Sequence, residues 1–201
     1  MKHFLTLAAL ALVGASPALA QTAPTSEALG GPVVPGVCLL SQQAVLTNAK
    51  AGLAATARLR ELSDQAKAEI EAERAPIAAD VKALDAQRAS LKPADLQQRQ
   101  QALSTRARAL QEKADLRSRE IEATRVKALG KIATEAQPVI ASVYKAHNCG
   151  LLADRNAMLG GNMANDLTGQ VVQGLDAKMS TITFDRETLA AAAPSKATAA
   201  R

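Results

Sequence analysis

The sequence predicts a mainly α-helical protein in which a long antiparallel helical hairpin, a coiled-coil arm, projects from a small body built around a short β-sheet. Three observations predict this fold class. No glycine occurs between Leu53 and Leu91, where most residues are strong helix formers. Aromatic residues make up only 1% of the chain, too few for a conventional globular core. A cysteine and a short apolar run lie on each side of the helical region, in residues 36–46 and 147–168.

The first twenty residues have the pattern of a cleaved secretory signal peptide. Lys2 and His3 precede an apolar run at residues 4–13 that is too short to span a membrane, and small residues precede Gln21. We therefore expect export, cleavage after Ala20 and a soluble mature chain. Residues 21–35 combine Pro, Gly, Ser and Thr without periodicity and are predicted to form a flexible leader.

Export affects the interpretation of the two cysteines, because an oxidising compartment commonly converts a pair into a disulfide. A bridge between Cys38 and Cys149 would close a loop of more than a hundred residues. Such a loop corresponds to at most about 4.7 kcal/mol in the loop-entropy model. Two buried free thiols are the alternative, since spacing alone does not prove pairing.

Heptad spacing predicts the arm over residues 49–146. Large apolar residues recur every seven positions in two series, and Pro93 can begin the second helix. The turn between the helices is expected near residues 90–93. Pro76 predicts a bend in the first helix and Pro138 a bend or break in the second, because proline removes a helical hydrogen bond. The series are Ile70, Ile77, Leu84 and Leu91, then Leu96, Leu103 and Leu110.

Residues 36–48 and 147–182 are predicted to form the small β/α oligomerisation body. Val37–Leu40 is expected to be a strand that leads into a helix near Ser41 or Asn48. The hairpin returns the chain to the same place, where Leu151–Asp154 and residues 156–159 are expected to add strands to one sheet. The disulfide would then staple the base of the arm.

A short helix is predicted to close the body. It should be capped by Asp166 or Thr168, and its apolar side should carry Val171, Val172 and Leu175. Residues 183–201 are rich in alanine towards their end and are predicted to be a disordered tail.

Catalytic and metal-binding patterns are not found in the sequence, so we expect no enzyme activity, no catalytic residue, no cofactor and no metal. His147 is the only histidine after the signal region, and no nucleophile set accompanies it. With Cys149 it would supply two ligands, fewer than a zinc site needs. Nucleic acid is not expected as a partner, because the exported chain lacks aromatic stacking residues.

Charge is concentrated at the predicted arm tip. Once Lys2 leaves with the signal peptide, 23 Lys and Arg residues remain against 19 Asp and Glu. Residues 74–108 hold seven basic and three acidic residues, the same excess of four. This basic tip should attract anionic partners such as lipopolysaccharide or a membrane surface, through contacts that salt weakens. An ordinary solvated helix surface is the alternative. We assign steering to Lys82, Arg88, Lys92, Arg99, Arg106 and Arg108.

The seam of the predicted hairpin is thin, because charged residues such as Glu73 and Arg88 occupy seam positions. Apolar residues that the facing helix leaves partly open would offer weak, adaptable contact to non-native chains. Complete burial within the hairpin is the alternative. We assign this apolar contact to Ile77, Val81, Leu84, Leu96 and Leu103.

The order of these features resembles the Skp/OmpH-type periplasmic chaperone family. The resemblance covers about Val37 to Asp176 and includes the strand and helix of "VCLLSQQAVLTNAKAG" and the charged helical hairpin. The closing segment is similar to the family's Asp-x-Asn-Ala and Asp-(Leu/Ile)-Thr elements. The matching residues are Asp154, Asn156, Ala157, Asp166, Leu167 and Thr168.

The resemblance implies a jellyfish-like homotrimer in the periplasm, whose arms surround a cavity and hold unfolded outer-membrane proteins without ATP. The expected function is therefore a holdase that acts before membrane insertion, through many weak contacts. A structural coiled-coil spacer that links envelope components is the alternative. The cysteine pair is not a general feature of the family, and the chain after Asp176 extends beyond the usual family end.

Overall fold

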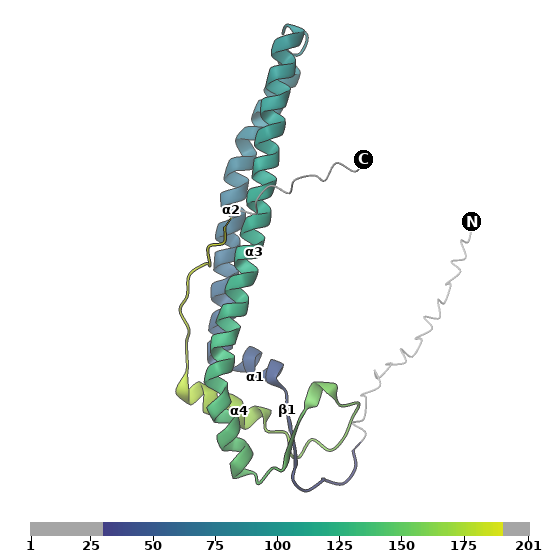
Figure 1. Ribbon diagram of the computed structural model, residues 1–201, viewed down its shortest axis with the longest axis vertical. Coiled ribbons are helices and arrows are strands. Elements are labelled where there is room, and N and C mark those ends of the chain that lie inside the picture. Colours follow the sequence, from purple (N-terminus) through teal and green to yellow (C-terminus); the bar gives the residue numbers. More distant parts are fainter. Residues whose placement is uncertain (1–29, 191–201) are drawn as a thin grey trace, which may run out of the picture.

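The computed structural model describes residues 30–190 and shows a long arm on a small body (Figure 1). The predicted signal peptide, the first part of the leader and residues 191–201 lie outside the described residues. Within residues 30–190, no helix is long and apolar enough to cross a membrane. The elements are β1 (Val37–Leu40), α1 (Gln42–Asn48), α2 (Lys50–Gln87), α3 (Pro93–Ala146), β2 (Leu151–Asp154), the 3-10 turn η1 (Arg155–Ala157) and α4 (Thr168–Lys178).

The arm consists of α2 and α3, which have 38 and 54 residues and run antiparallel. At 1.5 Å per residue their lengths are roughly 60 and 80 Å. The turn lies at residues 88–92, and Pro93 begins α3, where the fixed proline φ suits the first helical position. The longer α3 continues below the start of α2, so its last turns belong to the body.

Both prolines lie inside continuous helices. α2 runs through Pro76 and α3 runs through Pro138, so the break predicted at Pro138 is wrong. Each proline removes one backbone hydrogen bond, and at Pro138 the neighbouring turn is held from outside the helix. Next to Pro138, Val139 and Ile140 pack against the core of the body, and this contact keeps the helix together.

The first helical segment is split in two, which accounts for both helix starts that the sequence indicated. Ser41 caps α1 by accepting a hydrogen bond of 3.1 Å from the N–H three residues later. α1 ends at Asn48, and the extended ψ of 148° at Ala49 redirects the chain into α2. The first N–H of α2, at Lys50, donates to the Asp176 carboxylate of α4 at 2.6 Å. That contact links the start of the arm to the closing helix.

Gly52 marks the close approach of α1 to α2. A Cβ atom at this position would lie 1.7 Å from the Leu46 carbonyl oxygen, which is backbone and has little freedom to move. Only glycine therefore fits the junction as it stands.

The sheet contains two parallel strands, with the arm as the connection between them. Val37 pairs with Leu151 and Leu40 pairs with Asp154. The strand predicted at residues 156–159 is wrong, because the chain turns into η1 instead. The Asp154 side chain accepts a hydrogen bond of 3.0 Å from the Asn156 N–H, and this local bond competes with strand pairing.

The core lies entirely in the body and at the base of the arm. Its largest fully buried apolar side chains come from α1, α3 and the start and middle of α4: Val45, Ile132, Leu167, Val171 and Leu175. A disulfide joins Cys38 of β1 to Cys149, whose Cα atoms are 5.8 Å apart. The sulfurs lie within the same core and tie the first strand to the end of α3.

The chain after α4 corrects the prediction of a disordered tail for its first part. Residues 179–190, here called the strap, leave α4 and run extended along the hairpin towards the tip (Figure 1, yellow). Residues 183–190 are therefore held against the arm instead of being free.

The described end of the leader is also held, because the Gly31 carbonyl accepts a hydrogen bond from Asn162 at 2.8 Å.

Candidate functional site

The residues that carry the family resemblance form a polar cluster in the body, centred on Ser41. This serine is buried, and its N–H donates to the Thr168 hydroxyl at 2.9 Å. Its own hydroxyl accepts from the Asn156 amide at 2.9 Å. These bonds join the strand β1 to η1 and α4, which are more than a hundred residues away in sequence. The two family elements thus act together to close the body.

Asp166, two residues before the start of α4, stabilises this cluster. Its carboxylate accepts from the Thr168 N–H at 2.9 Å and forms an ion pair with Arg155 at 2.7 Å. Burial raises the pKa of Asp166, but the hydrogen bonds from Thr168 and Arg155 lower it more, so the net pKa lies below the ordinary value. The charged form of this carboxylate is therefore the one that the folded body requires.

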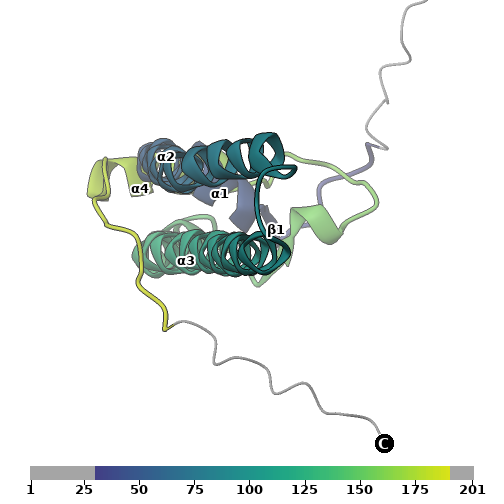
Figure 2. The same ribbon diagram turned by 90° about the horizontal axis from the view of Figure 1, so that it is seen from above.

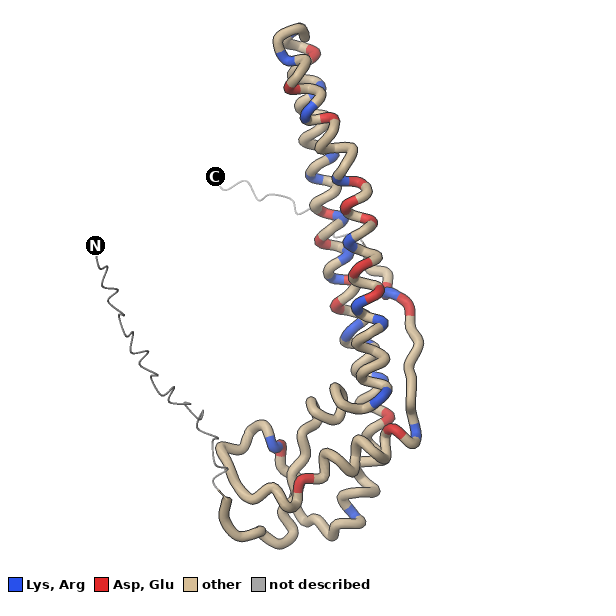
Figure 3. Tube along the Cα trace, turned by 180° about the vertical axis from the view of Figure 1, so that it is seen from behind, with Lys and Arg blue, Asp and Glu red and all other residues tan. Residues whose placement is uncertain are grey.

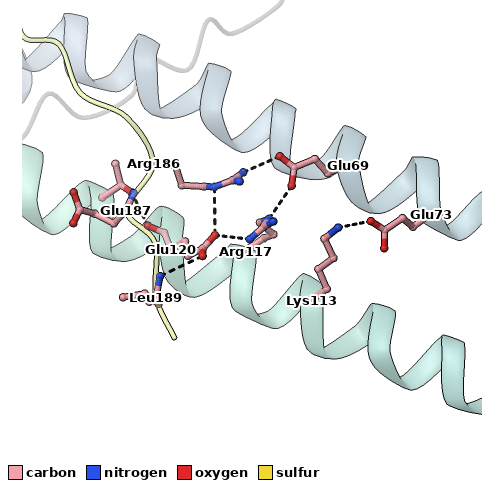
Figure 4. A network of polar contacts seen from close by, with 9 residues as sticks. Glu69, Glu73, Lys113, Arg117, Glu120, Arg186, Glu187 and Leu189 are labelled. Carbon is pink, nitrogen blue, oxygen red and sulfur yellow. Dashed lines mark hydrogen bonds and ion pairs between the residues drawn. The ribbon is translucent and has the colours of Figure 1, made fainter. Parts of the chain in front are cut away.

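A network of four charged side chains joins α2, α3 and the strap (Figure 4). Arg117 of α3 contacts Glu69 of α2 and Glu120 of α3, each at 2.8 Å. Arg186 of the strap contacts the same two carboxylates at 3.1 and 3.3 Å. Glu120 is only 2% exposed, so the two arginines compensate a buried negative charge. The hydrogen bond from Arg117, and further contacts with Arg186, lower the pKa of Glu69 although burial opposes this.

Cross-helix polar contacts continue from this network towards the tip. Their partners are Glu69 and Arg117, Glu73 and Lys113, Asp80 and Arg106, and Gln87 and Arg99. In each pair the two residue numbers add up to 186, so a single antiparallel register holds along the arm. Sequence reasoning missed these pairs. They could have been predicted by treating Pro93 as the midpoint of the hairpin, because the two partners of each pair lie the same number of residues before and after Pro93.

The five residues assigned to apolar contact lie along the distal seam with different exposure. Val81 is 45% exposed, whereas Leu84 is 8% exposed and offers little surface. Ile77, Leu96 and Leu103 are half-buried. Leu84 and Leu103 line an open groove of about 270 Å³ between the helices. Apolar surface is therefore available on the seam, mainly at its half-covered positions.

A larger open groove lies nearer the body. It has a volume of about 400 Å³, and its apolar lining comes from small and branched side chains of both helices. These are Ala66, Ile70, Ala114 and Ile121. Lys67, Arg74 and Arg117 border it, and each of them forms an ion pair with a carboxylate, so the apolar floor is bordered by paired charges.

The six residues assigned to the basic tip divide into two groups. Arg106 forms an ion pair with Asp80 at 2.5 Å, and Arg99 donates to Gln87 at 2.9 Å. The other four are exposed and form no ion pair within residues 30–190: Lys82, Arg88, Lys92 and Arg108. Figure 3 shows basic (blue) and acidic (red) positions interleaved along the trace of the arm up to the tip. Because the Gln87 amide is neutral, Arg99 keeps its charge unpaired as well, and of the six residues only Arg106 is neutralised by an ion pair in the described part of the chain.

His147 lies at the end of α3, where its ring contacts the Gln170 side chain of α4. In the described part of the chain, no group of three or more His, Cys, Asp and Glu side chains is placed to hold a metal ion.

The body also exposes apolar side chains on the leader, β2 and the loop after η1. Leu159 is fully exposed, and several neighbours in sequence are exposed to about half. The set comprises Val33, Val34, Leu151, Met158, Leu159 and Met163.

These features define a protein with a disulfide-linked body and a two-helix arm that carries open apolar grooves. Residues 36–175 match the family described as outer membrane protein (OmpH-like), and the chain belongs to this family. A solved structure from Caulobacter crescentus CB15, of a candidate outer membrane chaperone (OmpH-like), is 40% identical with a TM-score of 0.72. The match covers 80% of this chain and 95% of that chain. The comparison with curated proteins found no match.

Proposed function

We propose that this protein is an ATP-independent holdase chaperone of the periplasm that binds unfolded outer-membrane proteins and prevents their aggregation. The observation that carries the proposal is the arm, whose apolar seam is half-open and bordered by charges. Such a surface gives many weak contacts to a non-native chain while charged neighbours maintain solubility. Membership of the OmpH-like family supports a chaperone role.

The exposed apolar set of the body supports assembly into a homotrimer. A monomer gains nothing from exposing Leu159 with Met158 and Met163 beside it, whereas a body-to-body interface would cover them. Three bodies joined in this way would place three arms around a shared cavity. Client would then be held between arms instead of on one arm.

The exposed basic residues of the tip support contact with lipopolysaccharide or an anionic membrane. Replacing Lys82, Arg88, Lys92 and Arg108 with glutamine should weaken this binding, most strongly at low salt. The matched control replaces four exposed basic residues nearer the body: Arg60, Lys67, Arg119 and Arg125. Equal loss in both variants would contradict a dedicated tip site, because only net charge would then matter.

The test of the holdase function is the aggregation of a urea-denatured outer-membrane β-barrel protein on dilution, with and without the mature chain. Light scattering on the same sample gives the oligomeric state. Suppression near one trimer per client is the expected result. A trimer that leaves aggregation unchanged would remove the proposal and favour a coiled-coil spacer with a folded partner in the envelope.

A further inference from the structure

The strap lies beyond residues 36–175, the part of the chain that matches the family. Figure 2 shows it passing from α4 across the edge of the hairpin, from the side of α2 to that of α3. It has no helix or strand of its own, yet it is held in one extended path. The proximal arm therefore contains a surface that binds an extended chain.

Side chains of the arm recognise the backbone of the strap. The Phe184 carbonyl accepts from Arg58 of α2 at 3.2 Å, and the Glu187 N–H donates to the Thr124 hydroxyl of α3 at 2.8 Å. The Leu189 N–H donates to the Glu120 carboxylate at 3.3 Å. Backbone groups occur in every polypeptide, so these three contacts do not require the strap's own sequence.

The side chains of the strap alternate between the arm and solvent. Ile182 is 6% exposed and belongs to the core cluster, and Phe184 and Arg186 are half-buried. Thr183 between them is exposed, and the Asp185 side chain is 97% exposed. The two-residue period holds from Ile182 to Arg186, with Ile182, Phe184 and Arg186 towards the arm, and it ends at Glu187, which is also half-buried. Alternation of apolar and polar residues is also the pattern of a strand in a transmembrane β-barrel.

The surface also favours a positive charge on the chain that it binds, in addition to the backbone contacts and the alternating side chains. Arg186 completes the network with two carboxylates and Arg117. Without the strap, Glu69 and Glu120 would face only Arg117, which leaves one net negative charge on the arm. Another cationic side chain two positions after an apolar residue would restore the balance.

We infer that this face of the arm, formed around Arg58, Glu120 and Thr124, is a binding site for an extended, strand-like segment of an unfolded β-barrel client. The strap occupies the site in the client-free protein, and client displaces it. The preferred segment has apolar residues at alternate positions followed by Lys or Arg. This inference rests on the proposed holdase function and names the part of the client that the arm recognises.

The test compares the full mature chain with a chain that ends at Thr183, which keeps Ile182 in the core. The probes are a fluorescent peptide of residues 184–190, the part of the strap that the shortened chain lacks, and a urea-unfolded β-barrel outer-membrane protein. The shortened chain should bind the peptide, and its affinity for client should rise about tenfold, because a strap that is closed nine-tenths of the time reduces apparent affinity by that factor. Saturating peptide should release client from it.

Equal client affinity of the two chains, or client that saturating peptide does not release, would overturn the inference. Failure of the proposed function has a different signature: neither chain binds client, while the peptide still binds the shortened chain. Circular dichroism and an intact disulfide show that the shortened chain is folded.

A point variant tests the same site without removing the strap. Arg186→Gln takes away the strap's ion pairs with Glu69 and Glu120 and leaves Arg117 with both carboxylates, so client affinity should rise. The rise should be smaller than in the shortened chain, because the ion pairs of Asp185 and Glu187 with the arm remain. Arg125→Gln is the matched control, because Arg125 pairs only with Glu122 on the same helix at 3.7 Å. An effect of equal size in the control would contradict a role for the strap.

Discussion

The body and the arm are stabilised in different ways. In the body, a disulfide, a buried polar cluster and a continuous core join segments that are far apart in sequence. In the distal arm, two helices contact only each other, through half-buried apolar residues and exposed ion pairs. Local stability therefore decreases from body to tip. This arrangement suits the proposed client binding, because a fully packed seam would have no apolar surface to offer a client.

The largest expected effect concerns the disulfide of the body. Replacing both Cys38 and Cys149 with serine should lower the free energy of unfolding by about 2–5 kcal/mol, the usual range for a native disulfide. Urea unfolding followed by circular dichroism measures the change. Reduction of the unmodified protein is the parallel control and should lower the midpoint similarly. An unchanged midpoint in both would show that the core alone holds the body.

The next test compares leucines of the two regions directly. Leu175→Ala in α4 removes a fully buried side chain and should cost about 2–5 kcal/mol. Leu103→Ala in the distal arm removes a half-buried one and should cost about 1 kcal/mol, since less area leaves water there on folding. Equal losses in urea unfolding would contradict the difference in packing between body and arm.

A smaller effect is expected in the polar cluster. Thr168→Val keeps the shape of the side chain but leaves the buried N–H of Ser41 without its acceptor, which should cost about 1–3 kcal/mol. Thr134→Val on the exposed side of α3 removes only a local bond to the Gly130 carbonyl and serves as the control. Thermal unfolding should separate the midpoints of the two variants by about 2–4 °C for each kcal/mol, the range for a chain of this length. Coincident curves would show that Ser41 finds another acceptor.

The sequence predicted the arm and the main parts of the body because their signals are local. Helix-forming residues without glycine predict α2 and α3, and Pro93 marks the start of the second helix. The strap was missed because Ile182, Phe184 and Arg186 have partners only after α2 and α3 have come together. η1 was missed because one side-chain bond from Asp154 outweighs the strand preference of the residues that follow.

The candidate site was predicted only in part. Periodicity locates the seam residues, but their exposure depends on how closely the two helices approach. Leu84 and Val81 are three positions apart and differ from 8% to 45% exposure. Charge counting likewise found the excess at the tip but not the pairing of Arg106 with Asp80. To predict that contact, one must know which residues of the two helices lie opposite each other, and the periodicity of a single helix does not give this register.

The smallest expected effect is a dependence of the body on pH. The folded state lowers the pKa of Asp166, whereas an unfolded Asp has a pKa of about 3.9. The stabilisation is therefore complete above about pH 4 and is lost as pH falls through the lower pKa of the folded state, because the unfolded state then binds the proton more readily. Urea midpoints measured between neutral pH and about pH 3 should show this loss.

Asp166→Asn should be less stable at neutral pH and should show a smaller decrease on acidification. The control Asp95→Asn changes an exposed carboxylate in the first turn of α3, at the tip, and should keep the full decrease. If Asp166→Asn retains the same pH dependence as the unmodified protein, the acid sensitivity belongs to other carboxylates, with Glu69 in the arm network as the next to replace. If Glu69→Gln then removes the decrease, the pH response originates in the arm network that also holds Arg186 of the strap.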